Sequence, residues 1–325
     1  MHPGNDVALI ISTSNVPQLH RDIMTRIATK VKGVSKMARL FVLGSGGPSP
    51  SNDRFGESYV LQIGDEYLMF DCGPGTTYKL FKMGMSPTQI DHLFFTHHHF
   101  DHDVDYPCFL LTRWDTGAGQ VNQLNVYGPT LTEQLTERIL DEEVGAFAHD
   151  WIARINHPLS LGAYKIRGGT LPRKPPTLNA QDIGPGRVTS GKNWEVTSAP
   201  AEHVQPYLDS LAYRVDTEEG SFVFTGDTRP CDSVAELSKG ADVLVCVCVN
   251  IQSEIDGKTE SREGEYMCGT TAAGKLAQEA EAKKLVLVHN AGMAQRGKME
   301  RAIVDTASVY DGEIIWGEEL MEVPL

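Results

Sequence analysis

The chain has 325 residues, 41% of them hydrophobic, which is enough for one large domain or two modest ones with a sizeable core. Lysine and arginine number 29 against 43 acidic residues, and the resulting net charge of -14 disfavours proteins that grip nucleic acid through its phosphates. No apolar run reaches transmembrane length, and six cysteines in a chain this long do not make a disulfide framework. We therefore predict a cytoplasmic protein and expect neither nucleic acid nor a membrane as its partner.

Residues 1–36 are predicted to form an appendage with an amphipathic helix. Its apolar side chains recur every four residues, at Leu19, Ile23, Ile27 and Val31. We expect this helix to pack on the body of the protein, with dimerisation or contact with a membrane surface as alternatives. A second methionine, Met37, precedes the first strong strand, so the catalytic domain is predicted to span 37–325. We expect a homodimer.

The pattern after Met37 alternates between strands and helices. Apolar runs predict strands over 38–44, 59–64, 66–71, 92–96, 124–129, 210–215, 221–226, 242–249 and 284–289. Helical spacing follows 73–77 and recurs at 130–142, 232–239, 270–282 and 298–308. The two strands at 59–64 and 66–71 predict a hairpin. Such alternation indicates sheets covered by helices, and hence an α/β layered domain.

One long segment, 156–194, is dense in glycine and proline, and we predict long loops with short strands there. Its basic residues are interpreted as a solvated loop, with a basic patch as the alternative; they are Arg167, Arg173, Lys174, Arg187 and Lys192. Cys246 and Cys248 are interpreted as small core residues of a buried strand.

The segment from Thr96 to His102 predicts a metal site. Side chains in extended chain repeat with period two, so His97 and His99 point the same way and could share one ion. His98 points to the other face. If the chain then turns into a helix, Asp101 and His102 come beside the first pair, where they could hold a second ion. Imidazole nitrogen with carboxylate oxygen suits zinc, with iron or manganese as substitutes.

Further ligands are expected downstream, because these residues cannot complete two sites. His203, Asp227 and His289 each follow an apolar strand, and sites in layered α/β folds are commonly built at the carboxyl ends of strands. The other histidines are interpreted as ordinary surface or core residues; they are His2, His20, His92, His98, His149 and His157.

With these residues the chain resembles the metallo-β-lactamase superfamily over essentially all of 38–325. The resemblance implies a four-layer αββα sandwich with two zinc ions per chain. It implies that His97, His99 and His203 hold the first zinc. Asp101, His102 and His289 would hold the second, and Asp227 would bridge both. Asp71 matches a family aspartate that does not bind the metal itself but hydrogen-bonds to a metal ligand. Such an aspartate orients the ligand and raises its basicity.

The finer resemblance is to the ribonuclease Z and arylsulfatase-like branch. It is carried by residues 43–50, 125–129, 212–215 and 224–228. Two departures argue against processing of tRNA. Only 23 residues separate His203 from Asp227, too few for the arm with which ribonuclease Z grips tRNA. The family's His-Ser-Thr element is also missing, its nearest match being Cys268-Gly269-Thr270.

The resemblance implies a hydrolase whose nucleophile is a hydroxide shared by both zinc ions. Asp227 and Asp101 are the predicted catalytic side chains, and Trp114, Cys268 and Thr270 the candidate pocket residues. We expect a small, aromatic substrate, cleaved as an aryl sulfate or ester or dehalogenated as a chlorinated aromatic such as chlorothalonil. A ribonuclease Z-type RNA phosphodiesterase or a lactonase is the alternative. A metal-binding protein without turnover is disfavoured because all seven ligands are intact.

Overall fold

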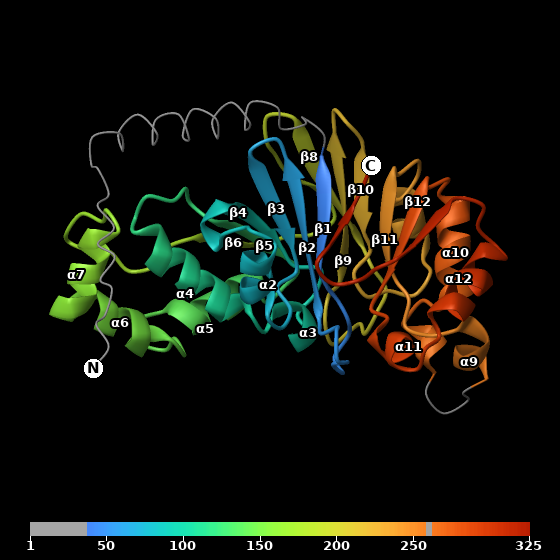
Figure 1. The fold of residues 1–325 in the computed structure, drawn as a ribbon, viewed down its shortest axis with the longest axis horizontal. Coiled ribbons are helices and arrows are strands. Elements are labelled where there is room, and N and C mark those ends of the chain that lie inside the picture. Colours follow the sequence, from blue (N-terminus) through green and yellow to red (C-terminus); the bar gives the residue numbers. More distant parts are fainter. Residues whose placement is uncertain (1–37, 258–261) are drawn as a thin grey trace, which may run out of the picture. The chain divides into compact units, whose positions relative to one another are not determined.

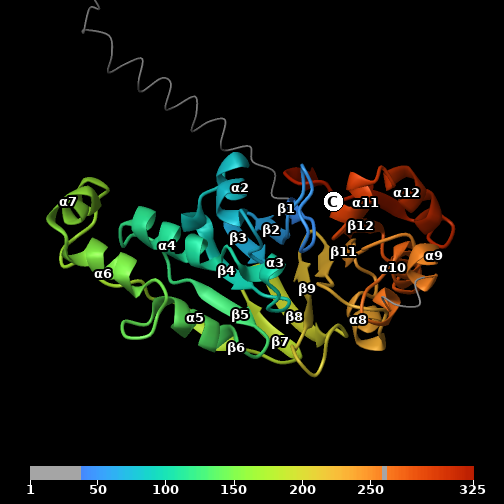
Figure 2. The ribbon, with the colours of Figure 1, turned by 90° about the horizontal axis from the view of Figure 1, so that it is seen from below.

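The computed structural model describes residues 38–257 and 262–325 of the chain. The predicted amphipathic helix and the predicted boundary of the appendage fall outside these residues and stay predictions. Two seven-stranded mixed sheets make up the centre of the described part. Figures 1 and 2 show the first sheet with α4 and α5 beside it, and the second sheet with α10 and α12 on the other side of the molecule.

The first sheet has the strand order β14-β1-β2-β3-β4-β5-β6. Its strands are β1 (Arg39–Ser45), β2 (Glu57–Ile63), β3 (Glu66–Phe70), β4 (Ile90–Phe94), β5 (Asn125–Gly128), β6 (Asn179–Asp182) and β14 (Met321–Val323). Strands β14, β1, β2 and β3 pair antiparallel, as the predicted hairpin requires, and β3 to β6 pair parallel. The parallel strands therefore end at one common edge.

The second sheet has the order β13-β12-β11-β10-β9-β8-β7. Its strands are β7 (Gly186–Ser190), β8 (Trp194–Pro200), β9 (Leu211–Thr217), β10 (Ser221–Phe224), β11 (Val243–Val247), β12 (Lys284–Val288) and β13 (Glu313–Trp316). Strands β7 to β10 pair antiparallel, and β10 to β13 pair parallel.

The helices occupy the outer layers and the connections between strands. They are α2 (Thr76–Lys82), α3 (Phe100–Asp103), α4 (Tyr106–Gly117), α5 (Thr132–Leu140), α6 (Ala148–Asn156), α7 (Pro158–Ile166), α8 (Asp232–Leu237), α9 (Gln252–Asp256), α10 (Thr270–Glu279), α11 (Ala291–Gln295) and α12 (Met299–Ala307). Among the helices of 38–257 and 262–325, none combines the length and apolar character that crossing a membrane requires.

The period-two alternation of the strands builds the layers. In β1, Leu40 and Val42 point into the core between the two sheets, whereas Phe41 and Leu43 point into the core under the helices of the first sheet. The second sheet behaves likewise, since Val245 packs between the sheets and Cys246 packs under the outer helices. The predicted αββα sandwich is therefore correct.

The prediction of loops over 156–194 is wrong for its first part, which is the helix α7. Pro158 is the first residue of that helix, where its missing N–H costs no hydrogen bond, so this proline begins a helix instead of interrupting one. The later part of the segment contains the short strands β6 and β7, as predicted. Figures 1 and 2 both place α6 and α7 at the end of the molecule farthest from α12.

Candidate metal centre

Seven His and Asp side chains meet at the edge where the central strands end. His97 and His99 follow β4, and the short helix α3 carries Asp101 and His102. The other three come from the second sheet: His203 follows β8, Asp227 follows β10, and His289 directly follows β12. The exposed fraction of each of these side chains is 8% or less, except for the half-buried His99.

The first group of ligand-type atoms consists of His97, His99, His203 and Asp227. The Nδ1 atom of His99 lies 3.0 Å from Nε2 of His97 and 3.3 Å from Nε2 of His203. Oδ2 of Asp227 lies 3.9 and 3.7 Å from the same two nitrogens. A tetrahedral zinc ion with bonds of about 2.0–2.1 Å separates its ligands by about 3.3 Å. The spacing of the first group fits such an ion.

The second group consists of Asp101, His102 and His289, and Asp227 also reaches it. Oδ2 of Asp101 lies 3.7 Å from Nε2 of His102 and 3.5 Å from Nε2 of His289. Asp227 contacts both histidines, with Oδ1 at 3.6 Å from His102 and Oδ2 at 3.3 Å from His289. The two oxygens of Asp227 therefore lie between the two groups.

The second group leaves four buried polar atoms without a hydrogen-bond partner among the described residues. These atoms are Asp101 Oδ2, His102 Nε2, Asp227 Oδ1 and His289 Nε2. Buried polar atoms are rarely left unpaired, since each costs about 1–3 kcal/mol. Atoms that face one another in this way suit a cation that would satisfy all of them.

Hydrogen bonds behind the site fix which nitrogen each imidazole turns towards it. Asp71 Oδ2 accepts from Nδ1 of His102 at 2.8 Å and from the hydroxyl of Thr96, which in turn lies 3.1 Å from Nδ1 of His97. The carbonyl of Tyr266 accepts from Nδ1 of His203 at 3.0 Å. With Nδ1 of each ring held from behind, all three rings turn Nε2 towards the site, as metal ligation requires.

The electrostatics of the first group favour cation binding. Burial and the neighbouring histidines hold the pKa of His97 well below its usual value, and burial also lowers the pKa of His99. Both imidazoles are therefore neutral at pH 7 and keep a lone pair for a metal. Burial opposes the charge of Asp227, but His289 and His102 outweigh it and hold its pKa well below the usual range.

A cavity of about 300 Å³ opens onto both groups. Besides the ligand-type residues it is lined by Pro48, Val204, Val249, Tyr266 and Met267. One wall is the loop after β1, where Gly47 packs on the imidazole of His289. A Cβ atom at Gly47 would lie 2.4 Å from Cε1 of that ring, so the loop needs glycine there.

The remaining predicted residues are not in this cavity. Asp71 lies behind it, as predicted, and His98 contacts Thr132 at 2.8 Å and Asp103 at 3.3 Å, away from both groups. Cys268 is buried under the second sheet, and Thr270 begins α10, where its hydroxyl accepts from the backbone of Gln252. Neither residue lines the cavity at the metal groups, and their role as pocket residues stays a prediction.

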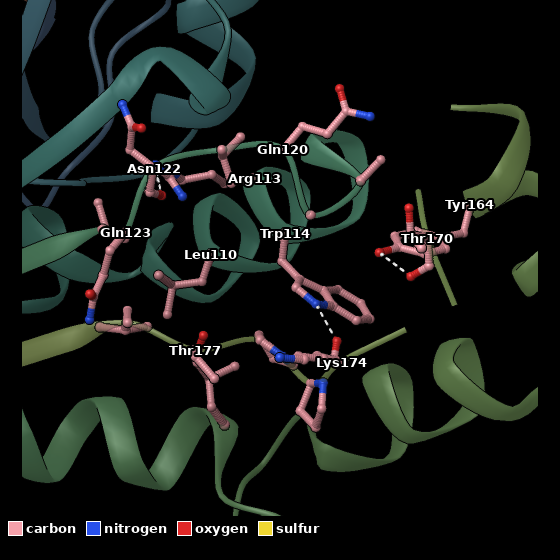
Figure 3. A pocket seen from close by; sticks show the side chains of 18 of the residues that line it. Leu110, Arg113, Trp114, Gln120, Asn122, Gln123, Tyr164, Thr170, Lys174 and Thr177 are labelled. Atoms are coloured by element: carbon pink, nitrogen blue, oxygen red, sulfur yellow. Dashed lines mark hydrogen bonds between the residues drawn. The ribbon is translucent and has the colours of Figure 1, made fainter. Parts of the chain in front are cut away.

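Trp114 lines a different pocket, of about 570 Å³, between α4 and the loop that carries Lys174 (Figure 3). Its Nε1 donates to the carbonyl of Lys174 at 3.1 Å, and the guanidinium of Arg173 lies 3.9 Å from the ring centroid. Arg173 is buried and bonded to Asp115 at 2.7 Å, so it is not part of a solvated loop. Trp114 therefore does not line the cavity at the metal groups, and its role as a substrate-pocket residue stays a prediction.

Two kinds of residue were missed by the sequence analysis. Met267 and Val249 line the cavity, but nothing in an isolated apolar residue distinguishes a cavity wall from a core position. Glu57 is different, since it is 1% exposed at the start of an apolar strand, and a buried glutamate always needs an explanation. Burial raises the pKa of Glu57 to about 8.

Comparisons with known proteins agree with this geometry. The family model of the metallo-beta-lactamase superfamily matches residues 51–246. Ribonuclease Z of Mycobacterium bovis is 28% identical over 290 residues, which cover 88% of this chain and 98% of that protein. Ribonuclease Z of Mycobacterium tuberculosis is 27% identical with the same coverage.

Solved structures show the same fold. The metallo-beta-lactamase fold protein YhfI from Bacillus subtilis has a TM-score of 0.65 at 19% identity, covering 88% of this chain and 98% of that one. The short form of human tRNase Z has a TM-score of 0.61 at 19% identity, covering 89% and 99%. Zn(2+)-bound PqqB from Methylobacterium extorquens has a TM-score of 0.58 at 13% identity, covering 89% and 100%.

Proposed function

Since this chain belongs to the metallo-beta-lactamase superfamily and is a metallo-hydrolase with a buried His/Asp site, we propose that it binds two zinc ions and hydrolyses a small, apolar substrate. His97, His99 and His203 would hold the first ion. Asp101, His102 and His289 would hold the second, and Asp227 would contact both. The distances between these side chains and the unpartnered atoms among them support the assignment.

Two adjacent divalent cations, when bound, supply Lewis acidity and activate water at neutral pH. The protein contributes the surroundings. Asp227 is buried and lines the cavity, so we assign it the role of accepting the proton of the attacking water. Asp101 Oδ2 would serve as a second proton acceptor. The buried contacts of Asp71 and Thr96 hold the ligand imidazoles in one tautomer throughout.

The lining of the cavity supports an apolar substrate, and this observation carries the proposal. Val204, Val249 and Met267 supply apolar walls, and no lysine or arginine lines the cavity within the described part of the chain. An aryl sulfate or ester, or a chlorinated aromatic of the chlorothalonil kind, combines an apolar ring with a leaving group of low pKa. Such a leaving group departs without a strong protein acid, and no lysine or arginine of the described residues lines the cavity to serve as one.

The surface beside the cavity is unfavourable for RNA. A neighbouring groove of about 690 Å³ shares His203 with the cavity and carries the carboxylates of Glu202, Asp209 and Glu265. Its one basic residue, Arg229, is bonded to Glu202 at 2.7 Å. Proteins hold RNA phosphates mainly through lysine and arginine, so this groove would repel a tRNA backbone.

The comparisons favour the second candidate, a ribonuclease Z-type RNA phosphodiesterase. The curated relatives named above are ribonuclease Z proteins matched over 88% of this chain, and they support this activity more directly than any comparison supports an aromatic substrate. Against it, the interval between His203 and Asp227 is short and already contains the hairpin of β9 and β10, at 211–224, so it holds no inserted arm.

A substrate panel separates the two candidates. The zinc-loaded protein is assayed on aryl sulfates, aryl esters, lactones, a chlorinated nitrile aromatic and a tRNA precursor with a 3′ trailer, with Asp227→Asn as the blank. We expect turnover of one of the aryl substrates and none of the precursor. Cleavage of the precursor with no turnover of any aryl compound would establish the ribonuclease Z-type activity instead.

A further inference from the structure

Glu57 lies at the edge of the first sheet on which the metal centre is built. It begins β2, and because β2 runs antiparallel to its neighbours, the start of β2 lies beside the ends of β1 and β3. Its register partner is Ser45, the last residue of β1, and its carbonyl accepts from the backbone N–H of Gly73, just after β3. The carboxyl group is thereby brought next to Asp71 and the second group of ligands.

The two oxygens of Glu57 have different surroundings. Oε2 accepts from the hydroxyl of Tyr59 at 2.8 Å, which anchors the carboxyl group from the core side. Oε1 is buried and has no hydrogen-bond partner among the described residues. One oxygen is therefore held in place while the other is left for a group that is not a protein side chain.

The neighbours of that carboxyl group are ligand-type atoms. Glu57 forms one cluster with Asp227 and His289 and another with Asp71 and His102, with ligand atoms within 4.8 Å of one another in each. No lysine or arginine of the described residues forms an ion pair with Glu57. Four carboxyl groups thus share one buried region, where His102 and His289 compensate part of their charge and a bound cation would compensate more of it.

We propose that Glu57 Oε1 is a further oxygen donor to the second cation of this centre. The inference rests on the proposed function, because it presupposes that two cations bind. The second site would then combine three carboxylates with two imidazoles, whereas the first has three imidazoles and one carboxylate. Oxygen-rich sites favour manganese-like ions of higher coordination number over tetrahedral zinc. The two positions would therefore differ in metal preference.

The test measures metal binding by the full chain instead of turnover. Metal-free protein is titrated with Zn²⁺ and with Mn²⁺ against a chromophoric chelator, and the visible spectrum of the Co²⁺-loaded protein is recorded. Glu57→Gln keeps the size and hydrogen-bonding ability of the side chain but removes its charge. Glu57→Asp keeps the charge but withdraws the oxygen. Glu66→Gln, at the start of β3, is the matched control.

We expect wild type and Glu66→Gln to bind two cations. Both Glu57 variants should keep the first cation with unchanged affinity and bind the second at least about ten-fold more weakly. The loss should be larger for Mn²⁺ than for Zn²⁺, and the Co²⁺ bands of one site alone should change. A thermal melt of each metal-free variant shows that it is folded.

Three other outcomes overturn the inference. If Glu57→Gln binds both cations like wild type, Glu57 is not a donor, while the proposed dinuclear hydrolase stands. If Glu57→Asp matches wild type and only Glu57→Gln loses affinity, the group acts through its charge and not through ligation. If wild type itself binds fewer than two cations, the proposed function fails together with the inference.

Discussion

Asp71 Oδ2 lies 2.8 Å from Nδ1 of His102, and neither side chain is exposed to solvent. The same carboxylate accepts from the backbone N–H and the hydroxyl of Thr96, one residue before His97. A single buried side chain on the loop after β3 thus orients ligands that belong to both groups. This arrangement makes the centre sensitive to a residue that contacts no cation.

Asp71→Asn is therefore expected to weaken metal binding by about 10- to 100-fold, with a parallel loss of activity at limiting metal. The amide has one acceptor oxygen where the carboxylate has two, so it cannot accept both from the backbone N–H of Thr96 and from the donors on the other oxygen, the Thr96 hydroxyl and His102. Chelator competition measures the affinity. Asp103→Asn is the control, because Asp103 contacts His98, which is in neither group. Equal affinities for the two variants would contradict the orienting role.

The pair His97 and His98 tests the ligand assignment with neighbouring residues. His97→Ala should reduce the bound zinc and lower activity at least 100-fold. His98→Ala should retain both cations and lose about 1 kcal/mol of stability, because it removes contacts with Thr132 and Asp103 and no ligand of either group. Elemental analysis of the dialysed proteins gives the zinc content. A zinc-free His98 variant beside a zinc-replete His97 variant would reverse the assignment.

Much of this centre could be predicted because short stretches of sequence identify its residues. His97, His99 and His102 stand within six residues, and Asp227 and His289 follow the apolar strands β10 and β12, each of which pairs parallel with β11. Register within a parallel sheet then places strand ends together without knowledge of the loops. The fold was predictable for the same reason, since strands and helices alternate with clear periods.

The walls of the cavity could not be predicted, since they depend on loop conformations. Met267 and the adjacent Cys268 both belong to the core under the second sheet, yet Met267 also lines the cavity and Cys268 does not. The Trp114 ring stacks against the guanidinium of Arg173 in a separate pocket, a contact that depends on the loop conformation and is not visible in the sequence. Pro158 was taken for a loop residue because a proline at the first turn of a helix looks the same in sequence as one that breaks a helix.

Asp115 provides a prediction on stability and pH. Burial raises the pKa of Asp115, but Arg173 and Arg167 outweigh burial and hold that pKa below its usual value. Asp115→Asn would leave Arg173, whose side chain is 2% exposed, without its charge partner, at a cost of about 2 kcal/mol near pH 7. Denaturant unfolding of the metal-free protein measures this cost.

The pH dependence of the Asp115 effect has a definite sign. Because the folded-state pKa is depressed, the carboxylate contributes its full stability above the unfolded value of about 3.9 and loses it as the pH falls through the folded value. The difference between wild type and Asp115→Asn should therefore shrink only in acid. Asp150→Asn, which affects the half-exposed Arg154, should cost less than about 0.5 kcal/mol. A constant difference down to the folded pKa and below would contradict the ion-pair origin.

Met267 tests which pocket receives the substrate. Met267→Ala removes apolar contact from the wall of the metal cavity, so we expect KM for an aryl substrate to rise about five- to ten-fold, equivalent to roughly 1 kcal/mol, with little change in bound zinc. Trp114→Phe changes the separate pocket of Figure 3 and should leave KM unchanged. A KM effect confined to the Trp114 variant would move the substrate to that other pocket.

Gly47 links the loop after β1 to the second group of ligands. In Gly47→Ala the new Cβ would lie 2.4 Å from Cε1 and 2.9 Å from Nε2 of His289, so the imidazole must move and with it a ligand of the second cation. We expect the second cation to bind at least about ten-fold more weakly while the first, which His289 does not contact, keeps its affinity. Gly162→Ala is the control, because nothing lies within 4 Å of a Cβ there. Metal titration of both variants decides the matter: weakening of the first cation alone would mean that His289 serves the other group.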